Sequence, residues 1–146
     1  MEKLPPHEPE IPSWVTNNAV AKEEFEYKGK KIHYWVFKKE ARPEFPGFVV
    51  YYEPDNIIYV SEEISAADRP HYAKHEYIEF NELNGQHGRC AEALQREIAD
   101  LPEDMKKAYL KTRTDFFARL NNFYANSEDV AFIEEIQKSY KYLLSI

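Results

Sequence analysis

The first half of the chain carries the alternation of hydrophobic and polar residues that is typical of β-strands. Residues 25–28 alternate and lead into a Gly-Lys turn signal at Gly29, which is followed by an aromatic and β-branched run at residues 32–37. Two more runs, at residues 48–52 and 57–60, flank a Glu-Pro-Asp-Asn turn. The pattern predicts about four strands before residue 62, paired in one small antiparallel sheet.

The second half changes to the spacing of helices, with hydrophobic residues three or four positions apart. We expect about four helices, over residues 69–83, 87–99 and 101–122 and from a cap at residues 127–129 to the C-terminus. The last helix carries a core-facing stripe made of Val130, Ile133, Ile136, Tyr140 and Leu143 or Leu144. Because the strands come first and the helices second, the predicted fold class is α+β.

The whole chain is predicted to form one domain, since 146 residues suit a single hydrophobic core. In this prediction residues 1–13, which are rich in proline, form an extended arm, residues 14–62 the β-rich half and residues 63–146 the helical half. Hydrophobic residues make up 43% of the chain and aromatic residues 15%, which is enough apolar material for a packed core.

Charge and cysteine content narrow the classes of function. The formal net charge of −7 gives no broad positive surface for a phosphate backbone, so we expect no nucleic-acid partner. Cys90 is the single cysteine, which excludes an intramolecular disulfide and suits a reducing compartment. No apolar run approaches the roughly 20 residues that span a bilayer, and residues 1–12 lack the apolar core of a secretory signal. We therefore expect a cytoplasmic protein without a membrane partner. A basic cluster is predicted to be a solvated helix face: Lys106, Lys107, Lys111 and Arg113.

The segment around His75 is the part of the chain best suited to carry chemistry. His75 and Glu79 are four residues apart, so both side chains lie on one face of the predicted helix. With Glu76 directly after His75, the segment reads His-Glu-x-x-Glu, a variant of the zinc motif His-Glu-x-x-His. In that motif the residues at the two ends bind the metal and the Glu acts on water. A carboxylate is also a zinc ligand, so Glu79 can replace the second imidazole.

The third ligand is expected to be His87, which follows a predicted turn and can fold back toward the first helix. The site would then hold two imidazoles and one carboxylate, a composition found in catalytic zinc sites and also accepted by iron or manganese. Three residues are substitutes for the third ligand: His71, Cys90 and Glu92. Ordinary structural roles are the alternatives for all these residues, such as helix capping, burial in the core or a solvated helix face.

Around this motif a strand-turn-strand and a short loop precede Ala73-Lys74-His75-Glu76, and a second helix with residues 92–97 follows. This order, over roughly residues 45–100, resembles the minimal gluzincin core of the ImmA/IrrE-type metallopeptidases. The resemblance implies a zincin-like core and a zinc-dependent hydrolase that acts on a peptide or protein substrate. It also implies that Glu76 is the general base toward the metal-bound water. Glu79 departs from the family, which has a second His at this position.

Two other functions stay open from the sequence. One is a non-catalytic metal-binding or protein-interaction domain on the same scaffold. The other is an oligomeric scaffold, because the last two helices carry an aromatic-rich stripe that suits an interface or the core: Phe116, Phe117, Leu120, Phe123 and Phe132. The metal content of the purified protein separates the hydrolase from a scaffold that binds no metal.

Overall fold

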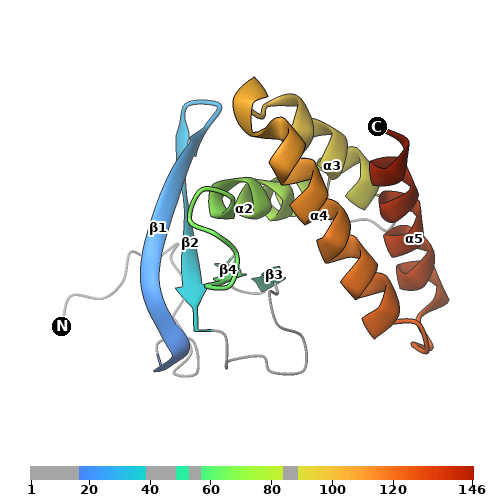
Figure 1. Cartoon of the computed structure of the whole chain (residues 1–146). Coiled ribbons are helices and arrows are strands. Elements are labelled where there is room, and N and C mark those ends of the chain that lie inside the picture. Colours follow the sequence, from blue (N-terminus) through green and yellow to red (C-terminus); the bar gives the residue numbers. More distant parts are fainter. Residues whose placement is uncertain (1–16, 39–48, 53–56, 84–88) are drawn as a thin grey trace. The chain divides into compact units, whose positions relative to one another are not determined.

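The computed structural model describes residues 17–38, 49–52, 57–83 and 89–146 (Figure 1). The chain divides into two compact units, Met1–Glu76 and Tyr77–Ile146. From residue 19 on, strands precede helices along the chain, so the predicted α+β class is confirmed. The predicted arm at residues 1–13 lies outside the described residues. Within the described part of the chain, no helix is both long enough and apolar enough to cross a membrane.

Strands β1 (Ala19–Tyr27) and β2 (Lys30–Phe37) form an antiparallel hairpin, drawn in shades of blue in Figure 1. The two residues between the strands, Lys28 and Gly29, have φ values of 51° and 79°. Positive φ at both central residues belongs to the tight turn whose twist matches that of the paired strands. The turn therefore uses Lys28-Gly29, one residue earlier than the expected Gly-Lys pair.

The sheet continues with β3 (Val49–Tyr52) and β4 (Ile57–Ser61), in the order β1-β2-β4-β3. Strand β4 pairs antiparallel with β3 but parallel with β2. The prediction of an entirely antiparallel sheet is therefore wrong at the β2–β4 pair. The path of the chain is the reason: β3 takes the far edge, and the chain returns as β4 between β2 and β3, in the direction of β2.

The central position of β4 agrees with its burial. Ile58, Tyr59 and Val60 are buried in succession, so side chains on both faces of this strand are covered. On β2 the side chain of Phe37 is fully buried and stacks on Tyr59, with ring centroids 4.8 Å apart. Aromatic and β-branched residues of the two inner strands thus form the centre of the first unit.

Helix α2 (Arg69–Tyr77) leads without a break into η3 (Ile78–Glu82), a short π-helix. The two elements together cover the predicted helix at residues 69–83. A turn precedes the first helical residue, because the backbone oxygen of Ser65 accepts from the N–H groups of Asp68 and Arg69 at 2.9 and 3.0 Å. The change of helix type after Tyr77 was not expected from the hydrophobic spacing.

The second unit contains α3 (Cys90–Ala99), α4 (Glu103–Phe123) and α5 (Val130–Ser145), and α5 packs against both α3 and α4 (Figure 1). These bounds agree with the predicted helices, except that the expected start of α3 at His87 lies outside the described residues. Asp129 caps α5, since its side chain accepts from the N–H of Phe132 at 3.1 Å.

The core of the second unit is built from the facing sides of its helices. Its large apolar members include Leu94, Ile98, Phe116, Phe117, Ile136 and Leu143. The predicted stripe on α5 is confirmed at Ile136 and Leu143, whereas Val130 and Leu144 are exposed in the first and last turns. Burial of Phe116 and Phe117 assigns this part of the aromatic stripe to the core, while Phe123 is 44% exposed.

Arg113 contradicts the prediction of a solvated basic face on α4. Lys107 and Lys111 are exposed as expected, but Arg113 is buried and forms an ion pair with Glu97. Arg113 lies on the same side of α4 as the buried residue Tyr109, one helical turn away. The basic residues of this helix therefore divide between solvent and core.

Candidate metal centre

The helix that carries His75 is attached to the sheet at its first residue. Nη1 of Arg69 lies 3.0 Å from Oε2 of Glu23 on β1, and Nε of Arg69 donates to the backbone oxygen of Ile64 at 2.9 Å. The other oxygen of Glu23 accepts from the hydroxyl of Tyr34 on β2 at 2.8 Å. Burial, and then this hydrogen bond and the charge of Glu23, raise the pKa of Tyr34. The start of α2 is thus tied to two strands.

Three consecutive ionisable residues in the last two turns of α2 are buried: Lys74, His75 and Glu76. His75 is the most buried of them, at 2% exposure. The ammonium of Lys74 lies 5.6 Å from the centre of the Tyr27 ring, within the range of a cation–π contact. Because charged residues are seldom buried without a specific role, this run identifies the end of α2 as a candidate site.

Glu79 lies in η3, where the backbone departs from the α-helix. The N–H of Leu83 donates to the backbone oxygen of Ile78 at 2.9 Å, across the five-residue span that defines a π-helical turn. Such turns are rare and occur frequently at functional sites. The π-helix begins at Ile78, between His75 and Glu79.

His75, Glu79 and Cys90 bring three ligand atoms together. An imidazole nitrogen of His75, a carboxylate oxygen of Glu79 and the sulfur of Cys90 all lie within 4.8 Å of one another. His75 and Cys90 are buried, and Glu79 is partly exposed. Nitrogen, carboxylate oxygen and thiolate sulfur are the three kinds of side-chain ligand that zinc accepts. The arrangement is therefore suited to hold one metal ion.

Two of the three ligands predicted from the sequence belong to this group. His75 and Glu79 lie together as their spacing predicts, and Cys90, one of the substitutes, contributes the third atom. His87, the expected third ligand, lies outside the described residues. The sequence does not distinguish a cysteine that binds metal from one that only packs in the core, because a buried cysteine is compatible with both roles.

The other candidates are placed differently. The carboxylate of Glu92 pairs with Arg89 and Arg96 on the surface of α3 and is not one of the three ligands. His71 lies one helical turn before His75 and is likewise outside the group. Glu76, the expected general base, directly follows His75 and is buried.

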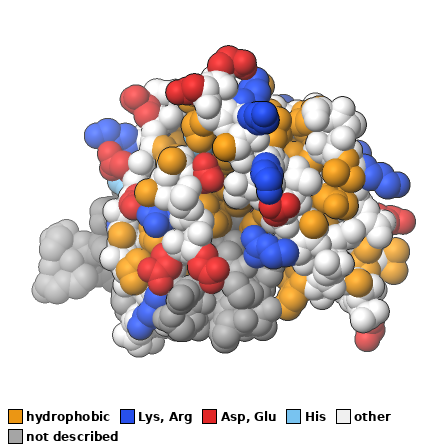
Figure 2. Space-filling view, in the orientation of Figure 1, with side chains coloured by type: hydrophobic (Ala, Val, Ile, Leu, Met, Phe, Trp, Pro, Cys, Tyr) orange, Lys and Arg blue, Asp and Glu red, His pale blue; other side chains and the backbone are white. Residues whose placement is uncertain are grey.

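Charged side chains of both signs are interspersed on the face of the molecule shown in Figure 2, with hydrophobic side chains between them. A polyanion that approached a lysine or arginine on this face would also meet carboxylates. The protein as a whole has 26 acidic residues against 19 Lys and Arg.

Comparisons of the chain with protein-family models, curated protein sequences and solved structures found no match. The resemblance to the ImmA/IrrE-type core therefore stays a prediction that depends on the residues quoted for it. The geometry of His75, Glu79 and Cys90 is the basis for a proposal about function.

Proposed function

We propose that the protein binds one zinc ion through His75, Glu79 and Cys90, and that this site serves a hydrolase of the metallopeptidase type. The observation that carries the proposal is the approach of the three ligand atoms to within 4.8 Å. Zinc ligands bind at about 2.0–2.3 Å, so the ligand atoms of a tetrahedral site are roughly 3.5 Å apart. Small side-chain rotations would bring the three atoms to that separation.

The chemistry of the ligand set favours zinc over the other common divalent ions. A thiolate is a soft ligand that magnesium and calcium avoid and that zinc accepts. The described residues supply three ligands, and a site with three protein ligands and a fourth position open to water or substrate has the composition of a catalytic zinc site. The partial exposure of Glu79 supports access to that position.

The charge of the ligand set makes a general base important. Glu79 and a thiolate at Cys90 together carry two negative charges, which would neutralise the charge of Zn²⁺. A neutralised ion polarises its ligands less than one held by three neutral imidazoles. A neighbouring residue must therefore contribute more to removing a proton from the attacking water.

Glu76 is the residue proposed for this role. When bound, zinc supplies Lewis-acid activation of water and of a substrate carbonyl. Glu76 would accept the proton of the attacking water and transfer it to the leaving amine of a peptide. Its position directly after His75 corresponds to the Glu of the His-Glu-x-x-His motif, and this correspondence supports the assignment.

A non-catalytic metal-binding domain is the second candidate. The burial of His75 and Cys90 favours it, because structural zinc sites are closed and take all four ligands from the protein. In that case the ion would stabilise the fold, and its removal would lower the stability of the protein.

The two candidates are separated by measuring zinc content and peptide hydrolysis on the same preparations. We expect His75→Ala and Cys90→Ser to lose zinc, and Glu76→Gln to keep zinc but lose about 10²–10⁴-fold in hydrolysis of a quenched peptide library. His33→Ala is the matched control, because His33 is an exposed histidine on β2. Zinc-bound protein without hydrolysis would select the non-catalytic domain, and unchanged zinc content in His75→Ala would refute the ligand assignment.

A further inference from the structure

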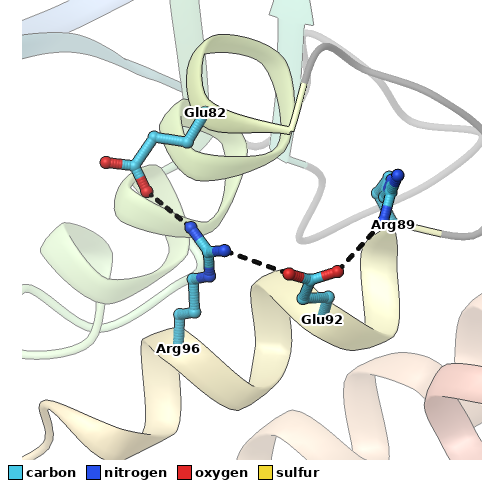
Figure 3. A network of polar contacts seen from close by, with 4 residues as sticks. All are labelled: Glu82, Arg89, Glu92 and Arg96. Atoms are coloured by element: carbon cyan, nitrogen blue, oxygen red, sulfur yellow. Dashed lines mark hydrogen bonds and ion pairs between the residues drawn. The ribbon is translucent and has the colours of Figure 1, made fainter.

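Four charged residues in η3, in α3 and directly before α3 form a chain of ion pairs, here called the Arg96 network (Figure 3): Glu82, Arg89, Glu92 and Arg96. Nη1 of Arg96 lies 3.0 Å from Oε1 of Glu82, and its Nη2 lies 3.0 Å from Oε2 of Glu92. The other oxygen of Glu92 lies 3.2 Å from Nη1 of Arg89. Figure 3 shows the guanidinium of Arg96 between the carboxylates of Glu82 and Glu92, so one side chain connects the two helical segments.

The Arg96 network is close in sequence to two of the proposed metal ligands. Glu82 follows Glu79 by three residues within the same π-helix, and Arg89 immediately precedes Cys90. The pair between Arg96 and Glu82 therefore joins the segment that carries Glu79 to the helix that carries Cys90. The pair between Arg96 and Glu92 holds the same guanidinium to the first turn of α3.

We propose that Arg96 is a positioning residue of the metal site, which keeps η3 and the start of α3 at the separation that metal binding requires. The inference rests on the proposed zinc site and adds the residue that maintains it. Arg96 does not touch the ion in this account, and it acts through Glu82 and Glu92.

Arg96 is suited to this role by the geometry of its guanidinium rather than by the stability that its ion pairs contribute. The side chain of Arg96 is 41% exposed, and exposed ion pairs contribute little to the stability of a fold. A planar guanidinium, however, donates to two carboxylates in directions that are fixed relative to each other, whereas the donors of a lysine ammonium rotate on a flexible stem. Because Arg96 contacts Glu82 and Glu92 and none of the three ligands, its loss should weaken metal binding less than the loss of a group that hydrogen-bonds a ligand directly.

The test is the affinity of the full chain for Zn²⁺, measured by competition with a chromogenic chelator. We expect Arg96→Gln to bind Zn²⁺ about two- to fivefold more weakly than the wild type, the size of effect that exposed ion pairs have on an equilibrium. Co²⁺ provides a second readout, because its charge-transfer absorption with a thiolate reports whether the sulfur of Cys90 is bound. This absorption should weaken in Arg96→Gln at saturating Co²⁺, which a general loss of stability would not cause.

Two variants serve as controls. Lys106→Gln removes the same charge from an ion pair with Glu103 at 3.0 Å on α4, so its affinity for Zn²⁺ should equal that of the wild type. Arg96→Lys keeps the charge but lacks the fixed donor directions of the planar guanidinium, so its affinity should fall between those of the wild type and Arg96→Gln.

The outcomes separate this inference from the zinc site itself. Wild-type affinity and an unchanged Co²⁺ spectrum in Arg96→Gln would overturn the role of Arg96 and leave the zinc site intact. An equal loss of Zn²⁺ affinity in Arg96→Gln and Lys106→Gln would show that the effect comes from the lost charge alone. This result would also overturn the role of Arg96. A wild-type protein that binds neither metal would remove both the proposed function and this inference.

Discussion

Helix α3 takes part in two ion-pair networks that differ in their surroundings. The Arg96 network lies at the surface, with 41% of the Arg96 side chain exposed. The second network consists of Glu97, Tyr109 and Arg113 and is here called the Glu97 network. Glu97 and Arg113 are 0% and 1% exposed. Two adjacent residues, Arg96 and Glu97, thus form the same kind of interaction in water and in the protein interior.

The Glu97 network is bidentate and closely packed. Nε and Nη2 of Arg113 lie 2.9 and 3.1 Å from the two carboxylate oxygens of Glu97, which also accepts from the hydroxyl of Tyr109. The guanidinium of Arg113 lies 5.0 and 5.2 Å from the ring centres of Phe116 and Phe117. Hydrogen bonds and aromatic faces thus replace part of the water that both charges lose on burial.

The difference in burial predicts different consequences of mutation. In the interior each charge depends on its partner, because an isolated buried charge is strongly unfavourable. At the surface water replaces a lost partner, so the pair contributes little to stability and its effect is on geometry. We therefore expect loss of the Glu97 network to lower the stability of the second unit strongly, and loss of the Arg96 network to change mainly the affinity of the proposed metal site.

The largest expected effect is that of Glu97→Gln. The substitution leaves the charge of Arg113 buried without a carboxylate, and we expect the free energy of unfolding to fall by about 3–5 kcal/mol. Chemical denaturation monitored by circular dichroism measures this change.

A triple variant, Glu97→Leu with Arg113→Met and Tyr109→Phe, tests the reason for that loss. Because it removes both charges together with the hydroxyl that donates to Glu97, and keeps the volume apolar, its stability should return to within about 1 kcal/mol of the wild type. A loss below about 1 kcal/mol in Glu97→Gln alone would contradict the assignment of a buried ion pair.

Tyr109→Phe should have the next largest effect. It removes the hydroxyl that donates to Glu97 and leaves the ring in place. Hydrogen bonds to charged groups contribute about 1.5–3 kcal/mol, and we expect a loss of that size in denaturation experiments. Tyr140→Phe on α5 is a suitable control, since Tyr140 is only partly buried and should show little change.

The stability of the protein should also depend on Tyr142 at alkaline pH. Burial, followed by the negative charge of Glu97, raises the pKa of Tyr142 above its ordinary value of 10.0. The folded protein therefore retains this proton where the unfolded chain releases it, so the stabilisation is complete below pH 10 and is lost as the pH rises above it. Unfolding measured from pH 9 to 11 should show a shallower decline in Tyr142→Phe. Equal slopes in both proteins would contradict the raised pKa of Tyr142.

The smallest expected effect on stability is that of Arg96→Gln. Because both of its ion pairs are exposed, the free energy of unfolding of the metal-free protein should fall by less than about 1 kcal/mol. Differential scanning calorimetry with chelator present measures it. A loss of stability as large as that of Glu97→Gln would contradict the expected difference between the exposed network and the buried one.

The local elements of the fold were predictable from the sequence, and their long-range arrangement was not. The turn at Gly29 and the cap at Asp129 are set by residues next to one another, so the chain around them predicts the element. The insertion of β4 beside β2 depends on pairing between distant segments, for which alternation of side chains gives no indication.

Burial of charged and sulfur-containing residues was the harder part of the prediction. Arginine is usually a surface residue. Arg113, however, is four residues from both Tyr109 and Phe117, so all three side chains lie on one face of the helix. That spacing is the signal that could have identified it. The pairing of His75 with Glu79 followed from the same rule, whereas Cys90 lies on another helix and its approach depends on how the chain folds back.

The central claim is that one zinc ion is held by His75, Glu79 and Cys90, and X-ray absorption spectroscopy of the zinc-loaded protein tests it most directly. The account predicts one sulfur ligand at about 2.3 Å, together with nitrogen and oxygen ligands at about 2.0–2.2 Å. In Cys90→Ser, measured at a zinc concentration high enough to load the weakened site, the sulfur contribution should be absent. A spectrum without sulfur in the wild type, or a protein that retains no zinc, would contradict the account.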